Sequence, residues 1–500
     1  MTDRTHSPLR TECESGEPTV EPASLVRNST FLLAARFYNV VASGLLSVVT
    51  VRVFSVTEYG EFAIALALVQ VTTSLSELGI ATLGTRRLVQ GTHDPRRVLG
   101  VMVAAEILGS LAFAALLLPA ALLLGYSGEI IVLLALGVGL IVALGVHAAF
   151  AGAKHGQTRA HQQGGLNGTR DRSVNRHSAR LYRSGGRAAA LIVVMTMAEV
   201  AAVAVAAVML RRRLRLWPVF GGALRKVPGF LRAAAPIAAS GGIAVLYGRL
   251  DLIMLSKLDS VRAVAIYNVP LTIVELTYVV PAAITTAFFP LLTKQLAENR
   301  QDADASLSVL FRLFVAGGGV VALILVLAGG DLIELVFGSS YADSGPVVAI
   351  LAGVIVLNAL NYLIWYALLA SNQEARRWRV QLLGLALNAG LNVILIPTHG
   401  PEGAAVALLI SDFLVLGWFV VSARTTVLRT SLSTLLIRPV ALAGLLAVAT
   451  LLLLEALSGP LVAVVAISAW IAGLFGSRYL TLADLDPVIV PLRARRLTRG

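Results

Sequence analysis

The chain has 500 residues, of which 57% are hydrophobic and only 14% are charged, and its mean hydropathy is +0.80. This composition excludes a soluble globular protein, and apolar blocks of roughly 20 residues, the length of helix that crosses a bilayer, exclude a β-barrel with its alternating pattern. The net charge of +13 favours nucleic-acid binding only weakly, because Lys and Arg lie mostly in short loops beside apolar spans, where they orient a membrane protein.

The chain opens with a polar segment, residues 1–30, that contains its single cysteine, Cys13. This segment is rich in acidic residues and lacks the basic start and short apolar core of a secretory signal peptide. We interpret it as a disordered cytoplasmic tail. The single cysteine excludes an intramolecular disulfide.

Thirteen apolar spans follow the tail, each long enough to cross a membrane as a helix. They lie near residues 31–54, 61–83, 98–125, 130–153, 187–210, 230–255, 264–290, 313–336, 346–371, 378–396, 402–423, 436–457 and 459–480. With the N-terminus inside, basic loops alternate with loops poor in Lys and Arg, as the positive-inside rule requires. The exception is the span at 187–210, which has strongly basic segments at both ends and cannot have both ends inside.

The basic segment before this span, residues 154–187, holds eight Lys or Arg, three His and a single acid, Asp171. One extra crossing between residues 154 and 210 would restore the alternation of loop charge. The charge pattern therefore predicts fourteen crossings, one of which lacks a hydrophobic sequence.

Residues 50–87 read TVRVFSVTEYGEFAIALALVQVTTSLSELGIATLGTRR, which resembles the polysaccharide transporter family, the Wzx-type lipid-linked oligosaccharide flippases. That family typically has an Arg after the first helix, a YG.F entry to the second, an ELG near its end and then another Arg. The matching positions here are Arg52, Tyr59 with Gly60 and Phe62, residues 77–79, and Arg86. Residues 247–292 and 392–412 also resemble the family's seventh to eighth and eleventh to twelfth helices.

The resemblance covers most of residues 31–480 and implies an all-α polytopic membrane protein of the MATE-like MOP superfamily. The implied fold is a two-lobed bundle of 12–14 transmembrane helices around a central cavity, with alternating access by rocking of the lobes. On this basis we divide the chain into a cytoplasmic tail, an N-terminal lobe, a basic cytoplasmic linker, a C-terminal lobe, and two additional helices with a basic cytoplasmic tail. The divisions are residues 1–30, 31–210, 211–229, 230–423 and 424–500.

In the family, the fourth helix is followed by a short basic loop and a fifth membrane helix, a place that residues 154–187 occupy here. Our hypothesis is that this segment is read in a shifted frame and that the true frame encodes the fifth helix. One alternative is a genuine cytoplasmic insertion, which its composition would leave disordered. The other is a patch for nucleic acid or anionic lipid, for which Tyr182 alone offers a stacking surface.

Ionisable side chains within apolar spans are candidates for function, because inserting one costs about 2.5 to 3.5 kcal/mol on insertion scales. The candidates are Arg36, Glu77, Glu106, His147, Glu199, Arg249, Asp251, Glu275, Asp412 and Glu455. Arg249 and Asp251 resemble the family's R.D signature, and their side chains project from a helix roughly 200° apart, so they address different environments. Arg249 either faces the cavity and attracts a pyrophosphate or acidic sugar, or pairs with a carboxylate such as Glu275 or Glu77.

Three more arginines are candidate substrate ligands. Arg36 either lines the cavity or extends to the cytoplasmic headgroups. Arg52 and Arg86 match family positions at helix ends, where arginines also anchor a helix to lipid headgroups. For each of these three arginines, the alternatives are contact with lipid headgroups and contact with substrate.

Three carboxylates, Glu77, Glu275 and Asp251, are candidate ion-coupling groups. Glu77 and Glu275 occupy corresponding places in the two lobes, and a carboxylate in a low-dielectric cavity can couple proton or sodium movement to rocking. Helix packing through hydrogen bonds is the alternative. Interhelical hydrogen bonding is also the default role of the Asn pairs at 358 and 361 and at 388 and 392.

The sequence has no Gly-rich phosphate loop, metal-ligand cluster or nucleophile elbow, so we predict no enzyme, cofactor or metal. The predicted function is a flippase of the cell membrane, with both termini cytoplasmic, for a polyprenyl-diphosphate-linked oligosaccharide used in surface glycan assembly. Its partners would be that substrate, membrane lipids, and glycosyltransferases and a polymerase of the same pathway, but not nucleic acid. The alternative is a cation-coupled multidrug or small-molecule exporter of the same superfamily, followed by a membrane glycosyltransferase or polymerase.

Overall fold

A computed structural model describes most of the apolar part of the chain. The described residues are 42, 44–77, 79–91, 93–162, 187–371, 373–424, 438, 439, 441, 442, 445, 459–481 and 484. Within them the chain is helical and no strand is present. Eight helices in this part are long and apolar enough to cross a membrane, so the chain is a multi-pass membrane protein. Residues 1–30, Arg36 and residues 163–186 lie outside the described part.

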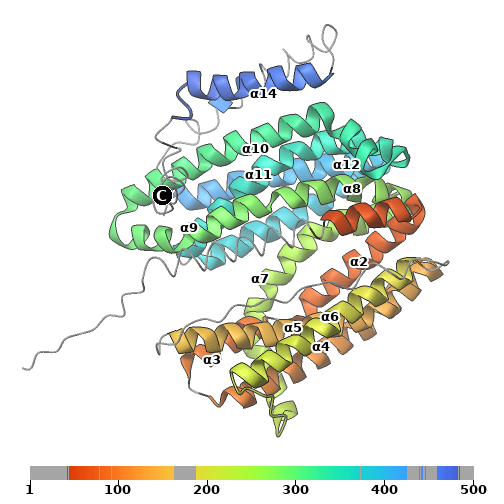
Figure 1. Ribbon diagram of the computed structural model, residues 1–500, viewed down its shortest axis with the longest axis vertical. Helices are drawn as coiled ribbons and strands as arrows, with labels where there is room; N and C mark the ends of the chain where they lie inside the picture. Colours follow the sequence, from red (N-terminus) through yellow and green to blue (C-terminus); the bar gives the residue numbers. More distant parts are fainter. Residues whose placement is uncertain are drawn as a thin grey trace, which may run out of the picture.

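The N-terminal lobe is a bundle of mutually packed helices (Figure 1). Its helices are the apolar helix Gly44–Val53, α2 (Val56–Glu77), α3 (Ile80–Gln90), α4 (Pro95–Leu123), α5 (Gly128–Gln162) and α6 (Arg187–Arg213). The predicted span at 61–83 is broken, because Gly79 adopts a φ of 67° between α2 and α3, a conformation that glycine accepts without steric cost. Asp94 then caps α4 by accepting a hydrogen bond from the Arg96 backbone.

Helices α5 and α6 are neighbours that run in the same direction. Gly139 of α5 faces Thr196 of α6, and further along both helices His147 pairs with Glu199. Two parallel neighbours in sequence require the chain to return to its starting side between them. The extra crossing predicted between residues 154 and 210 stays a prediction, because residues 163–186 lie outside the described part. The hypothesis of a shifted frame stays a prediction, because it concerns residues outside the described part.

The C-terminal lobe is a second bundle, and α7 joins the two (Figure 1). Its elements are α7 (Ala223–Leu258), α8 (Val261–Thr277), α9 (Val279–Glu298), α10 (Arg300–Phe337), the short 3-10 helix η1 (Ser339–Ser344), α11 (Gly345–Ala370), α12 (Glu374–Arg424) and α14 (Gly459–Gly476). Helix α7 begins inside the predicted linker 211–229, and α12 joins the two predicted spans at 378–396 and 402–423 through a kink at Gly400.

Three buried apolar clusters account for the two lobes. One lies among α3, α4, α5, the end of α6 and the first turns of α7, and a second among α9, α10, α11, α12 and α14. The third is shared, because residues of α2 and α5 pack there with residues of α7, α8, α10 and α11. Helix α14 lies on the outside of α10 (Figure 1), where Trp470 donates a hydrogen bond of 3.1 Å to the Ala316 carbonyl. The shared cluster places polar residues of both lobes next to one another.

Candidate functional site

A cavity of about 420 Å³ lies between the lobes. Its wall is formed by the helix that ends at Val53 and by α2, α6, α7 and α8, and most of the lining side chains are apolar. The polar and aromatic lining residues include Ser47, Thr50, Tyr59, Phe62, Gln70, Arg249, Asn268, Thr272 and Glu275. A mostly apolar wall with a few convergent polar groups is typical of a site for an organic ligand.

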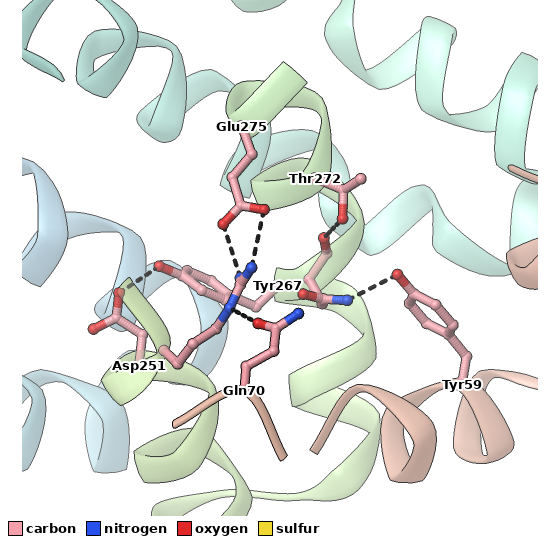
Figure 2. A network of polar contacts seen from close by, with 8 residues as sticks. Tyr59, Gln70, Asp251, Tyr267, Thr272 and Glu275 are labelled. Carbon is pink, nitrogen blue, oxygen red and sulfur yellow. Dashed lines mark hydrogen bonds and ion pairs between the residues drawn. The ribbon is translucent and has the colours of Figure 1, made fainter. Parts of the chain in front are cut away.

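Arg249 and Glu275 form an ion pair on this wall (Figure 2). The Arg249 Nη1 atom lies 2.8 Å from Glu275 Oε1, and its Nη2 atom lies 3.3 Å from Glu275 Oε2, so the ion pair is bidentate. Arg249 Nε also donates to Gln70 Oε1 at 2.6 Å. The side chains are 20% and 36% exposed, so both charges remain accessible from the cavity. The predicted pairing of Arg249 with Glu275 is present, and Arg249 lines the cavity as well.

A second set of hydrogen bonds connects the lobes beside this pair. The Asn268 amide of α8 donates to the Tyr59 hydroxyl of α2 at 2.8 Å, and the Thr272 hydroxyl donates to the Asn268 carbonyl. Figure 2 shows Tyr59 and Gln70 approaching from the N-terminal lobe and Glu275 and Thr272 from α8. The wall of the cavity therefore includes polar contacts between the two lobes.

Asp251 faces away from the cavity, as its spacing from Arg249 predicts. It is buried, and it accepts hydrogen bonds from the Tyr267 hydroxyl at 2.7 Å and from the Asn392 amide at 2.6 Å. Asn392 also donates to Asn388 Oδ1 at 3.0 Å. The predicted Asn pair on α12 thus links α12 to α7, and Asp251 belongs to a polar cluster inside the C-terminal lobe.

The other predicted residues lie away from the cavity. Arg52 donates from Nε to the Val336 carbonyl at 2.7 Å and from Nη2 to the Leu335 carbonyl, so it caps the last turn of α10. Arg86 is exposed on α3, and Glu77 is half-buried at the end of α2. The structure brings Arg249 and Glu275 together, and it keeps Arg52, Arg86 and Glu77 out of their wall.

The uncharged members of the site were not predicted from the sequence. Gln70 and Asn268 lie within apolar spans, where a lone amide is a usable signal because it must find a partner. Tyr59 belongs to the YG.F pattern, but the pattern itself does not indicate a cavity. Asp412 was noted without a role. Its carboxylate accepts a 2.7 Å hydrogen bond from Tyr247, beside a second cavity of about 260 Å³ in the C-terminal lobe.

Two comparisons of sequence bear on this site. A family model described as "Polysaccharide biosynthesis protein" matches residues 25–296, more than half of the chain. The chain is also similar to the protein named "Probable flippase AglR" of Haloferax volcanii, with 34% identity over 173 residues. That match spans 33% of this chain and 35% of the relative, about a third of each.

The fold is similar to those of solved transport proteins. A structure titled "Lipid II flippase MurJ, inward closed conformation" matches with a TM-score of 0.68 at 11% identity, over 90% of this chain and 100% of the other. An inward-facing multidrug resistance MATE family transporter of the MOP superfamily matches with a TM-score of 0.51 at 14% identity, over 74% of this chain and 91% of the other. At these identities the likeness establishes the two-lobed, MATE-like fold and no substrate.

Proposed function

This chain belongs to the polysaccharide biosynthesis protein family, and on that premise we propose that it is a flippase for a polyprenyl-diphosphate-linked oligosaccharide. The substrate would cross the cell membrane from the cytoplasmic to the outer leaflet for assembly of surface polysaccharide or glycoprotein glycan. The name of its relative, a probable flippase, supports this proposal. No bond of the substrate has to be made or broken, since the protein supplies only a path for the headgroup.

The observation that carries the proposal is the position of Arg249 on the wall of the interlobe cavity. A guanidinium group matches the geometry of phosphate oxygens and binds them with two parallel hydrogen bonds. In this structure the Glu275 carboxylate binds the Arg249 guanidinium, in the place that a phosphate group of the substrate would take. The hydroxyl and amide groups of Tyr59, Asn268 and Thr272 would receive the sugar part, while the lipid tail stays in hydrocarbon.

The proposed direction of access follows from where the lobes touch. The Tyr59 and Tyr341 rings meet edge to face with centroids 6.2 Å apart, and Arg52 reaches the end of α10. A side chain on Gly60 would collide with the Val261 backbone, since a Cβ there would lie 2.2 Å from its carbonyl oxygen. With both termini cytoplasmic, as the loop charges predict, these contacts close the outer side, and the cavity belongs to an inward-facing state.

The alternative, a cation-coupled exporter, would have a carboxylate-lined cavity without a basic group. Arg249 in the cavity favours an anionic substrate instead, because a buried cationic ligand beside a guanidinium would be repelled. The carboxylates of Glu275, Asp251 and Glu77 would then serve coupling by binding protons or sodium ions. Glycosyltransferases and a polymerase of the same pathway would supply and consume the substrate.

The test is a reconstituted flipping assay. Proteoliposomes would hold a fluorescent polyprenyl diphosphate linked to a sugar, and a membrane-impermeant quencher would measure its transfer between leaflets. We expect transfer by the wild type and at least tenfold slower transfer by Arg249→Ala, with Arg86→Ala, which removes an exposed arginine outside the cavity, as control. Uptake of an organic cation such as ethidium without transfer of the lipid would contradict the proposal and favour the exporter.

A further inference from the structure

Glu106 is a carboxylic acid inside the N-terminal lobe, away from the interlobe cavity. It lies on α4 with no exposed surface and faces α5, where a Cβ on Gly145 would lie 3.0 Å from its Oε2 atom and 3.1 Å from the Ser110 hydroxyl. A side chain at position 145 would therefore compete with the carboxyl group for space. Glycine at this position makes room for an acid that would otherwise not fit between two membrane helices.

The surroundings of Glu106 offer its carboxyl group no positive partner. Neither Oε1 nor Oε2 has a hydrogen-bond partner among the described residues. Ser110, one turn along α4, lies next to Ser76 of α2, with the two hydroxyl oxygens 3.5 Å apart. Glu77, the residue after Ser76 at the end of α2, is a further acid, so it supplies no neutralising charge. An ionised Glu106 would be a buried, unpaired charge, which is the least favourable state for a carboxyl group.

The end of α2 makes an ionised Glu106 less favourable still. Helix α2 stops at Glu77, and α3 starts at Ile80, so the last carbonyl groups of α2 end in the middle of a predicted membrane span. The Ser76 carbonyl faces Gly109 of α4, 3.0 Å from where a Cβ would stand. The carbonyl end of a helix carries partial negative charge. A broken helix at membrane depth is tolerated where its free backbone groups are buried in protein or line a cavity.

The other titratable groups of the lobe do not neutralise Glu106. His147 of α5 lies two residues after Gly145, so its side chain projects from another face of the helix. It pairs with Glu199 of α6. A metal ion is also disfavoured, because hard cations take about six or more oxygen ligands. Among the described residues, no group of three His, Cys, Asp or Glu side chains could hold one.

We propose that Glu106 is a proton-binding site of the N-terminal lobe, which exchanges its proton through Glu77. On release, the O–H bond of Glu106 breaks and the proton passes to the half-buried Glu77 carboxylate, and from there to water at the junction of α2 and α3. This leaves Glu106 ionised until the lobe rearranges and a proton returns. Helix α2 carries Tyr59 and Gln70 on the cavity wall and ends at Glu77. Protonation of Glu77 would therefore act on the same helix that lines the cavity.

The first experiment is infrared difference spectroscopy on the full chain in lipid nanodiscs. We expect a carboxylic acid band at neutral pH that persists into alkaline pH and is absent from Glu106→Gln. The matched control is Glu129→Gln, at an exposed acid in the first turn of α5, which should leave the band unchanged. An identical spectrum for Glu106→Gln and the wild type would overturn the proposal. Should Glu106→Gln fail to fold, Glu106→Asp serves instead, with a shifted band expected and an unshifted one contradicting it.

The second experiment tests exchange, and this part rests on the proposed flippase function. Transfer of the fluorescent lipid diphosphate would be followed across a pH series. We expect the wild type to depend on pH, Glu106→Gln to lose that dependence, and Glu77→Gln to slow transfer at least tenfold. A wild-type pH profile in Glu106→Gln would overturn exchange. If the wild type transfers no lipid at all, the flippase proposal fails, while the infrared band still decides the proton site.

Discussion

Arg249 of α7 and Glu275 of α8 hold each other on the wall of the cavity, with 2.8 Å between Nη1 and Oε1. Gln70, which bonds the same guanidinium from α2, ties this pair to the other lobe. On the proposed function, an anionic substrate would displace Glu275 from Arg249, and its arrival would also loosen a contact between the lobes. This is a physical route from binding to movement, because ligands shift a two-state equilibrium only through contacts that differ between the states.

The affinity for polyprenyl diphosphate should respond in opposite directions to changes at the two partners. Arg249→Ala removes a charged hydrogen-bond donor pair, so we expect binding to weaken about tenfold or more. Glu275→Gln removes the competing carboxylate and should strengthen binding. A binding titration in detergent with unlabelled lipid diphosphate measures both, with Arg86→Ala as the unaffected control. Equal effects of the two substitutions would mean that the pair has only a packing role.

Arg52 should stabilise the fold without binding substrate. Its guanidinium donates to the last-turn carbonyls of α10, where a positive charge is favourable. We expect Arg52→Ala to lower the stability by about 1 kcal/mol and Arg52→Lys to lower it less. Thermal unfolding in detergent measures this loss. Lipid diphosphate affinity should stay at the wild-type value, and a tenfold loss of affinity would instead place Arg52 in the substrate path.

Asp484 should make stability depend on acid pH. It accepts hydrogen bonds from Arg312 and from the Thr481 amide and hydroxyl. Burial raises the pKa of the Asp484 carboxyl, but these hydrogen bonds lower it more, so the pKa lies below its ordinary value. A lowered folded-state pKa gives stability that is present above the unfolded pKa, about 4, and lost as the pH falls through the folded value.

Asp484→Asn should therefore unfold at lower temperature than the wild type at neutral pH, by about 1 to 3 kcal/mol in stability. The two midpoints should converge below about pH 4. Thermal melts across a pH series measure the difference, and Asp331→Asn, at an exposed acid of α10, is the control. If the difference in unfolding temperature between the variant and the wild type stays constant down to acid pH, Asp484 stabilises the fold by packing and not by its charge.

Lys154 and Arg187 should lie on opposite sides of the membrane, because α5 and α6 are parallel. The start of α6 is fixed by a 2.8 Å hydrogen bond from Arg187 to the Val53 carbonyl. Since Cys13 is the single cysteine, Cys13→Ser gives a background for accessibility mapping. An impermeant maleimide should label Arg187→Cys and Ser127→Cys from one side and Lys154→Cys from the other. Labelling of Arg187→Cys and Lys154→Cys from the same side would contradict the parallel arrangement.

The coding DNA for residues 150–190 should contain an apolar run in a neighbouring frame. Translation of all three frames after resequencing tests this directly. A run of about 20 apolar residues, enough to cross the bilayer, would support a shifted frame and a fourteen-helix protein. If no frame holds one, residues 154–187 are an authentic segment and the shifted-frame hypothesis is wrong.

Part of the candidate site could be predicted because charge in an apolar span is conspicuous. Arg249, Asp251 and Glu275 are visible as rare ionisable residues, and helix periodicity alone separates Arg249 from Asp251. Gln70 and Asn268 were not predicted, since an uncharged amide stands out little in a polar-poor sequence. Arg52 matched a family position, yet which of two roles it takes depends on where α10 ends, and no local pattern encodes that.

The sequence by itself determined that this chain is a helical membrane protein of many crossings, because hydrocarbon requires long apolar runs with internally bonded backbones. Loop charges likewise predicted an extra crossing between residues 154 and 210. Only the tertiary structure decided which charges meet. The pairing of Arg249 with Glu275 and the isolation of Glu106 depend on which helix faces meet, and the capping of α10 by Arg52 joins helices far apart in the chain. Such contacts depend on how whole helices pack, and packing in a membrane is set by complementary surfaces that a one-dimensional pattern does not contain.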